Sequence, residues 1–386
     1  MAVSKWYIKT VKHVIITLMS FGVVAIVMAL AYNISFLSPI ANAIEDFSLA
    51  DIVYQVQKDK MSCRESRTIT IVDMTALDSR RKIAAYLDTI EMMKPKVVGV
   101  DIVFEGEKSD AGGDLMVLES VTSPEAKNMV FSYKLNALKD VTMPERRETH
   151  SFFLDEDVQV DEGFSDIERN LYGGMKRTFF TGWGEGGKFR PSLITAIANK
   201  YSDGHIKFDK SEKMLINFTP TIFPKIRYDS VKFHPELIEG RTVIYGGLTD
   251  QSDMHYTPIG KKSGVEVLAY ALNTLYNKET IKQASYPITL LLSFIIVLIV
   301  ELGQFSYERV LKNYCNDMLQ HFFASSFIIG LLTLPIMIFT VWVSLSCMIS
   351  FRYYVDAGLA ISAMLVLDSC RDFYNICEES WSKRKK

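Results

Sequence analysis

Acidic side chains are placed within or just after apolar runs that are typical of buried strands. Together with two polar neighbours, the candidate site residues are Asp73, Asp101, Asp250, Asp253, His255 and Thr257. Carboxylate oxygens are ligands for Mg²⁺ or Ca²⁺, and the same groups can hydrogen-bond a polar ligand. An aspartate after a strand also caps the following helix or holds a loop in place. The residue types alone leave all three roles open.

Motifs of the common catalytic classes are missing from the sequence. It contains no G-x-S-x-G nucleophile elbow, no H-E-x-x-H helix and no C-x-x-C pair. The acidic run DEDVQVDE (155–162) lacks the glycine of an EF-hand turn, so we interpret it as solvated surface. We therefore expect no catalytic residue, no metal site, no cofactor and no enzymatic activity. An external enzyme that uses Asp73, Asp101 and Asp253 with a divalent metal is a competing hypothesis.

A predicted helix joins the strands that carry Asp73 and Asp101. It begins at Asp78 or Ser79 and stops before Pro95. Two apolar strands joined by one helix imply a parallel pair with a right-handed crossover. This arrangement predicts that the two aspartates lie at neighbouring strand ends, on one edge of the sheet.

The stretch 242–277 contains the other four candidates. It begins as a buried strand, continues as a polar loop and, after Gly264, becomes a helix with Val265, Leu268 and Leu272 at helical spacing. The loop leaves the carboxyl end of its strand, which is where open α/β sheets bind ligands. Further strands are expected at 128–133, 176–181 and 214–218, with helices beginning at Gly112 and, with a proline in the first turn, at Pro191.

The apolar run 14–31 carries no charge and is long enough to cross a bilayer. Lys5, Lys9 and Lys12 precede it, so the N-terminus is expected in the cytoplasm. A cleaved signal peptide is the alternative, but the run exceeds a usual signal sequence, which favours an uncleaved anchor.

Three more spans are expected near the C-terminus, at 288–300, 322–345 and 353–367. Glu301, Arg352 and Asp356 lie in or near these spans and raise the possibility of a transport path. Each lies close to a predicted helix end, where a polar group reaches the interface. Transport is therefore the weaker interpretation.

The predicted fold is an α/β extracytoplasmic domain, a mostly parallel sheet with flanking helices, plus four transmembrane α-helices, one N-terminal and three C-terminal. The predicted boundaries are 1–33 for the N-terminus and first helix, 34–285 for the external domain, 286–370 for three helices and 371–386 for a basic tail. The formal net charge of −2 argues against a nucleic-acid partner. The expected partner is the lipid bilayer.

Several segments of the external region resemble one domain family. They are IVDMTALD (71–78), VVGVDIVFE (97–105), GGMKRTFF (173–180), RPSLITAIA (190–198), INFTPTIFPKI (216–226) and the stretch 241–275. In order, they resemble the CHASE-type sensor domain of the second type, found in bacterial histidine kinases, cyclases and related receptors. The resemblance covers about 35–285 and implies one helix before the domain and three after it.

Two departures from that family concern sequence and output. The family's Trp-Pro-Trp-x-Arg segment is absent, and Ser263-Gly264 replaces its Pro-Gly. Receptors of this type continue into a kinase, cyclase or phosphatase, whereas only about sixteen residues follow the last predicted span here.

The resemblance implies a sensor or receptor subunit that binds an unknown ligand or envelope protein. It would relay its state through the membrane helices to a separate output protein. We expect a homodimer or a hetero-complex in the bacterial inner membrane, with both termini cytoplasmic. The alternative is a structural or assembly subunit of an envelope membrane complex.

Overall fold

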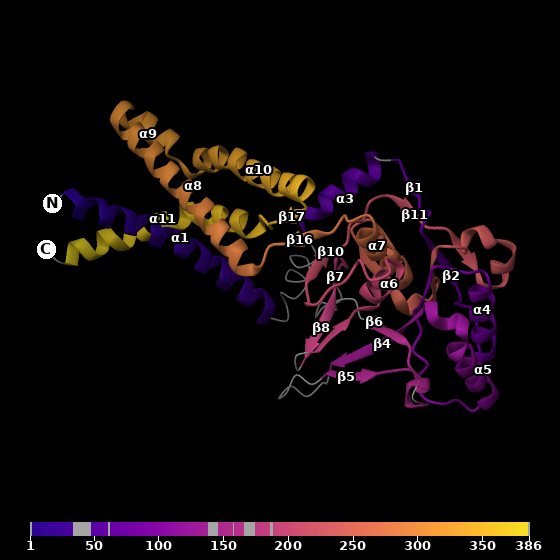
Figure 1. Cartoon of the computed structure of the whole chain (residues 1–386). Helices are drawn as coiled ribbons and strands as arrows, with labels where there is room; N and C mark the ends of the chain where they lie inside the picture. Colours follow the sequence, from indigo (N-terminus) through magenta and orange to yellow (C-terminus); the bar gives the residue numbers. More distant parts are fainter. Residues whose placement is uncertain are drawn as a thin grey trace. The chain divides into compact units, whose positions relative to one another are not determined.

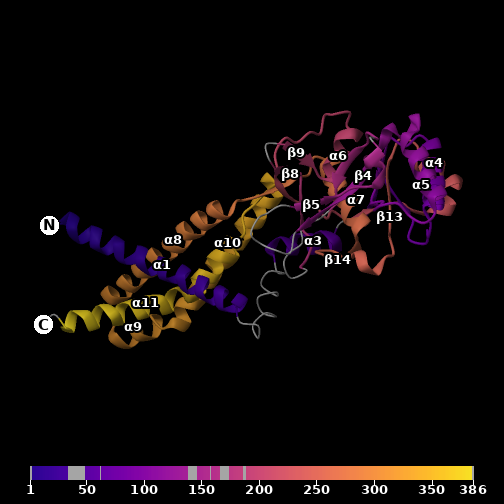
Figure 2. The ribbon, with the colours of Figure 1, turned by 90° about the horizontal axis from the view of Figure 1, so that it is seen from below.

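The computed structural model describes residues 2–33, 48–60, 62–137, 146–156, 158–165, 174–185 and 188–384. The chain forms two compact units (Figures 1 and 2). Tyr54–Lys282 form the first, which we call the globular unit. Met1–Val53 and Gln283–Lys386 form the second, the helical unit.

A mostly parallel sheet is the centre of the globular unit. Its strands lie in the order β12 (Lys225–Arg227), β2 (Ile69–Asp73), β13 (Thr242–Gly246), β3 (Val97–Val100) and β4 (Met129–Ala137). The first half of β4 pairs in parallel with β6 (Asp161–Phe164), and its second half pairs antiparallel with β5 (Arg146–Thr149). The predicted mostly parallel α/β fold is therefore observed.

The prediction that β2 and β3 are direct neighbours is wrong, because β13 lies between them. Ile244 of β13 is in register with Ile71 of β2 on one side and with Gly99 of β3 on the other. All five residues of β13 are buried, which suits a central strand covered on both faces. Apolar runs show that a strand is buried but do not show which strand is central.

Helices cover both faces of this sheet. Val98 and Val100 of β3 pack in one apolar cluster with residues of α4 (Arg80–Met92) and α5 (Ala111–Thr122). Between those valines, Gly99 faces α6 (Leu193–Tyr201), and a Cβ there would collide with the Ile197 side chain. The helix α7 (Gly264–Tyr276) packs beside α6 and against β2 and β13. Burial on both faces explains why the strands are continuous apolar runs.

Three boundaries differ from the sequence prediction. The strand expected at 97–104 ends at Val100. Pro191 ends strand β9 (Lys188–Pro191) rather than beginning a helix, and Ser192 caps α6 by accepting the Thr195 N–H. The strand expected at 176–181 is β7 (Thr178–Phe180), which pairs with β10 (Lys213–Leu215) and not with the central sheet.

Two short strands and a hairpin follow β13 and α7. The polar loop after β13 contains the hairpin of β14 (Met254–Thr257) and β15 (Gly260–Ser263), which periodicity did not predict. After α7 the chain does not run directly into a membrane helix. Lys278 has a positive φ, and β16 (Ile281–Gln283) pairs with β10 before the next helix.

The remaining elements of the globular region are short. They are α3 (Leu49–Lys60), β1 (Arg64–Glu65), η2 (Pro124–Asn128), η3 (Phe152–Glu156), β8 (Gly182–Glu185), β11 (Thr221–Ile222), η4 (Tyr228–Phe233), η5 (Pro235–Leu237) and η6 (Gln251–Asp253). Most of the connector predicted at 34–56 lies outside the described residues, and α3 is the part that is described.

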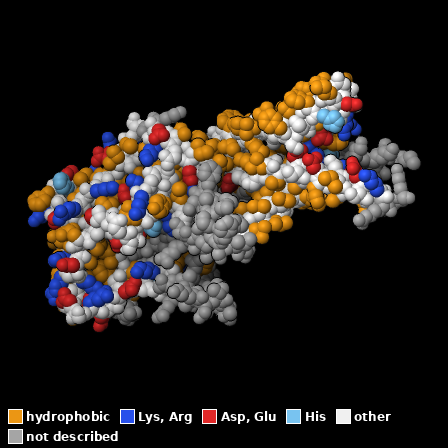
Figure 3. All heavy atoms as spheres, turned by 180° about the vertical axis from the view of Figure 1, so that it is seen from behind, with side chains coloured by type: hydrophobic (Ala, Val, Ile, Leu, Met, Phe, Trp, Pro, Cys, Tyr) orange, Lys and Arg blue, Asp and Glu red, His pale blue; other side chains and the backbone are white. Residues whose placement is uncertain are grey.

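The helical unit is a bundle with long apolar helices. It contains α1 (Ala2–Asn33), α8 (Tyr286–Tyr314), α9 (Asp317–Phe323), α10 (Ser326–Phe351), β17 (Tyr353–Tyr354) and α11 (Gly358–Arg384). Figure 3 shows hydrophobic side chains over these helices and a mixture of charges over the globular unit.

Among the described residues, three helices and not four are long and apolar enough to cross a membrane. They are Thr10–Leu30 in α1, α8 and α10, so one is N-terminal and two are C-terminal. The predicted span 353–367 fails because α11 begins only at Gly358 and reaches Asp368 and Arg371 within about four turns. The apolar part of α11 instead packs on α1 and α8, with Ala363 and Leu367 fully buried.

Candidate functional site

A pocket of about 220 Å³ opens at the carboxyl edge of the central sheet, inside the globular unit. Its charged or ionisable lining consists of Asp101, Lys134, Lys176, Asp253 and His255. Phe179, Phe180 and Leu268 contribute apolar surface. The site therefore combines both signs of charge with an apolar wall, as small-molecule pockets do.

The N-termini of α6 and α7 form part of the pocket wall. Leu193 and Ile194 line it from the first turn of α6, and Gly264 lines it from the first residue of α7. Strand β6 passes so close to α6 that a Cβ on Gly163 would lie 2.5 Å from Leu193 Cα. Because helix N-termini carry partial positive charge, the wall adds to the field of the two lysines.

Asp253 connects the polar loop to the start of α7. Its Oδ2 accepts the Gly264 N–H at 3.2 Å, and its Oδ1 lies 3.2 Å from His255 Nε2. A Cβ on Gly264 would collide with the Asp253 carboxylate, so only glycine allows this approach. Glu266 then accepts the Ser263 N–H at 3.1 Å, the backbone half of a capping box.

Asp101 and Lys134 come from neighbouring strands of the sheet. Asp101 follows β3, where its N–H donates to Tyr245 O at 2.9 Å. Lys134 on β4 bonds Glu105 at 2.7 Å and holds the pKa of that carboxyl below its usual range. Both pocket residues are thereby attached to rigid strands.

Lys176 reaches the pocket from the segment before β7. The Lys176 N–H donates to Tyr256 O at 2.7 Å, which ties this segment to the hairpin strand β14. The pocket wall therefore depends on the hairpin that carries His255.

Three of the six predicted residues, Asp101, Asp253 and His255, converge on the pocket. Asp73 is not among the lining residues; its carboxylate accepts the Thr75 N–H at 2.9 Å and the Leu248 N–H at 3.0 Å. It therefore holds together the loops that follow β2 and β13.

Asp250 and Thr257 also serve local structure. Asp250 accepts the hydroxyl and the N–H of Ser252, at 2.7 and 2.9 Å, and these bonds hold its pKa below the ordinary value. Thr257 is 3% exposed and donates to Gly260 O at 2.5 Å within the hairpin.

A metal role for the aspartates receives no support from their placement. Within the described ranges, no group of three or more His, Cys, Asp or Glu is arranged to hold a metal ion. Asp101 and Asp253 line the pocket, whereas Asp73 binds loop N–H groups.

The sequence prediction missed Lys134, Lys176 and the two helix N-termini. Lys176 lies in the family-like segment GGMKRTFF, which is the one signal that pointed to it. Lys134 had no such signal, because a lysine in a strand is ordinarily a solvated surface residue.

Comparison with known families gives one match. The family model of the CHASE2 domain matches residues 23–303, which is most of the chain. No curated protein and no solved structure matches the chain.

Proposed function

Because the chain belongs to the CHASE2 domain family, a family of extracytoplasmic sensor domains, we propose that it is a membrane-anchored sensor subunit. It binds a ligand or an envelope protein at the pocket and relays its state through the membrane helices to a separate output protein. Neither an enzymatic activity nor a cofactor is part of this proposal.

The observation that carries the proposal is the position of the pocket. It lies at the carboxyl edge of a parallel sheet, where such folds bind ligands. The N-terminus of α7 forms part of its wall, and α7 is followed in the chain by β16 and the apolar helix α8. A ligand that prefers one placement of α7 therefore has a short covalent route to the membrane helices.

For the topology, we propose a bacterial inner-membrane protein with both termini in the cytoplasm. Three candidate spans no longer give this result by counting. It is supported instead by a contact inside the helical unit, where Lys12 of α1 bonds Glu378 of α11 at 2.8 Å. This contact puts the first turns of α1 and the last turns of α11 at the same end of the unit, and lysines precede the span in α1.

Ligand binding is tested with the full chain in phosphatidylethanolamine–phosphatidylglycerol vesicles. A panel of amino acids, small carboxylates, amines and sugars is screened for a rise in the Tm of the globular unit. We expect at least one probe to raise the Tm of the wild type and of Lys232→Met, an exposed lysine away from the pocket lining. The same probe leaves the Tm of Lys176→Met and His255→Ala unchanged.

The relay to a partner is tested by purification in mild detergent. A sensor is expected to recover a kinase, cyclase or similar output protein whose activity changes with the probe. Recovery of a stoichiometric complex that no probe alters would favour the assembly-subunit alternative. A full panel without any Tm shift would reject the small-molecule site.

A further inference from the structure

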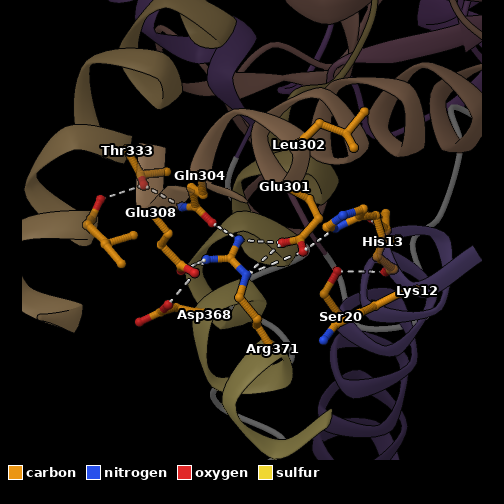
Figure 4. A network of polar contacts seen from close by, with 12 residues as sticks. Lys12, His13, Ser20, Glu301, Leu302, Gln304, Glu308, Thr333, Asp368 and Arg371 are labelled. Carbon is orange, nitrogen blue, oxygen red and sulfur yellow. Dashed lines mark hydrogen bonds and ion pairs between the residues drawn. The ribbon is translucent and has the colours of Figure 1, made fainter. Parts of the chain in front are cut away.

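A cluster of ionisable side chains is buried in the helical unit (Figure 4). Glu301 of α8 is fully buried, and Arg371 of α11 and His13 of α1 are 4% and 3% exposed. Ionisable groups inside membrane helices are costly and are normally kept for a specific role. The proposed sensing pocket does not use them.

Arg371 makes the central contacts of this cluster. Its Nε donates to the two oxygens of Glu301 at 3.3 and 3.2 Å, and a terminal nitrogen donates to the same carboxylate. The other terminal nitrogen bonds Glu308 at 3.0 Å and lies 3.8 Å from Asp368. One planar guanidinium thus connects α11 to two turns of α8, a geometry that an ammonium cannot reproduce.

The cluster also includes the other two long helices. His13 Nδ1 lies 3.1 Å from Glu301 Oε1, and the His13 ring packs on the Phe305 ring at a centroid distance of 4.6 Å. Gln304 accepts from Arg371 and donates to Thr333 of α10 at 3.0 Å. The same polar contacts therefore join α1, α8, α10 and α11.

The cost of separating such charges makes the contact specific. A shift of α11 by one residue along α8 would leave the Glu301 carboxylate buried without its partner, which is strongly unfavourable. Apolar packing around Ala363 and Leu367 has no comparable directional requirement. The arginine, rather than the apolar surface, thus selects one register.

We propose that Arg371 is a positioning residue that holds α11 in a single register against α1 and α8, so that movement of these helices reaches the C-terminal helix. The part about movement rests on the proposed sensor function. α1 precedes the globular unit in the chain and α8 follows it, so both connect directly to the domain proposed to bind the ligand.

A native cysteine reports whether α11 stays in place. Cys370 is adjacent to Arg371 and is 5% exposed, within the apolar cluster that α11 shares with α1 and α8. In the full chain with Cys63, Cys315, Cys347 and Cys377 replaced by serine, N-ethylmaleimide can reach it only when the helix moves away. Vesicles of phosphatidylethanolamine and phosphatidylglycerol supply the bilayer.

The expected results follow from pairing. Arg371→Leu and Glu301→Leu each leave one buried charge alone, so each raises the alkylation rate by about 30-fold or more. The double variant Glu301→Leu/Arg371→Leu removes both charges and returns the rate to within about 3-fold of the wild type. The matched control Arg309→Leu, an exposed cation on α8, leaves the rate unchanged.

The register is checked by electron–electron distance measurement between spin labels on Cys377 and Tyr314→Cys, both exposed. The wild type and the double variant are expected to give one narrow distance distribution, and Arg371→Leu a broad one. Where Arg371→Leu does not accumulate, Arg371→Lys is used, with a rise in alkylation of about 3-fold or more expected because one ammonium cannot bond both glutamates.

Two outcomes would overturn the proposal. Single variants that alkylate at the wild-type rate would show that the pair does not hold α11. A double variant whose rate equals the product of the two single effects would show that the residues act independently. Neither outcome depends on whether a ligand binds the pocket, so the sensor proposal is judged separately.

Discussion

Charged side chains gather at two places in this chain, and water has access to only one of them. At the pocket of the globular unit, the side chains of Asp253 and His255 are 44% and 27% exposed. In the helical unit, those of Glu301 and Arg371 are 0% and 5% exposed. Similar residue types are therefore under different constraints. Hydrated charges at the pocket can exchange partners with a ligand at small cost, whereas the buried pair in the helices holds one arrangement.

The largest expected effect breaks the buried pair. Arg371→Leu should lower the unfolding free energy of the helical unit by about 3–5 kcal/mol, because Glu301 is left as an uncompensated buried charge. The measurement is an unfolding titration of the full chain in mixed micelles. Arg81→Leu is the matched control, since the Arg81–Asp110 pair of 2.6 Å lies at the surface, with side chains 53% and 45% exposed.

For Arg81→Leu we expect no measurable change in stability. Equal effects of the two substitutions would contradict the contrast between the buried and the hydrated pairs.

An intermediate effect concerns the pocket wall, whose shape depends on backbone packing rather than on charge. Gly163→Ala places a methyl group 2.5 Å from Leu193 Cα, so β6 and α6 must separate. We expect a loss of about 1–3 kcal/mol in the unfolding free energy of the globular unit. Gly184→Ala is the control because nothing lies within 4 Å of its Cβ position. Wild-type stability of Gly163→Ala would show that the wall adapts freely.

The smallest effect is a pH dependence at the start of α7. Burial raises the pKa of Glu266, but hydrogen bonds from Lys225 and the Ser263 N–H lower it further, so the folded pKa lies below the ordinary value. A depressed carboxyl pKa stabilises the fold above the unfolded pKa of about 4.3 and loses this contribution as the pH falls through the folded pKa.

Lys225→Met should therefore have a lower Tm than the wild type at pH 7, and the two Tm curves should converge as the pH falls below about 4. Thermal unfolding of the full chain between pH 7 and pH 3 measures this, with Lys261→Met, an exposed lysine, as the control. A constant gap between the curves would show that the Lys225–Glu266 bond does not produce the difference.

Local patterns in the sequence were sufficient for much of the fold. The helical spacing after Gly264 and the apolar run before Asp73 predicted α7 and β2 to within one residue at the starts of both elements. Family-like segments in order predicted the CHASE2 match. Periodicity succeeds here because each element depends on contacts between nearby residues and one buried face.

Long-range pairing decided the rest. Whether β13 enters between β2 and β3 depends on competition among several equally apolar strands, which no local pattern resolves. Asp101 and Lys134 become neighbours at one pocket only because β3 and β4 pair. The count of candidate spans also changed, since α11 tolerates Asp368 and Arg371 through contacts with another helix.

What the sequence determined by itself is the set of buried strands and helices, the apolar membrane runs and the family. Only the tertiary structure decided which charges meet. His13 and Glu301 are 288 residues apart and Arg371 is 70 residues beyond Glu301. Charges seek partners through space, and a single sequence carries no record of those distances. Hence Glu301 was interpreted from the sequence as a group near a helix end, whereas folding places it at the centre of three helices.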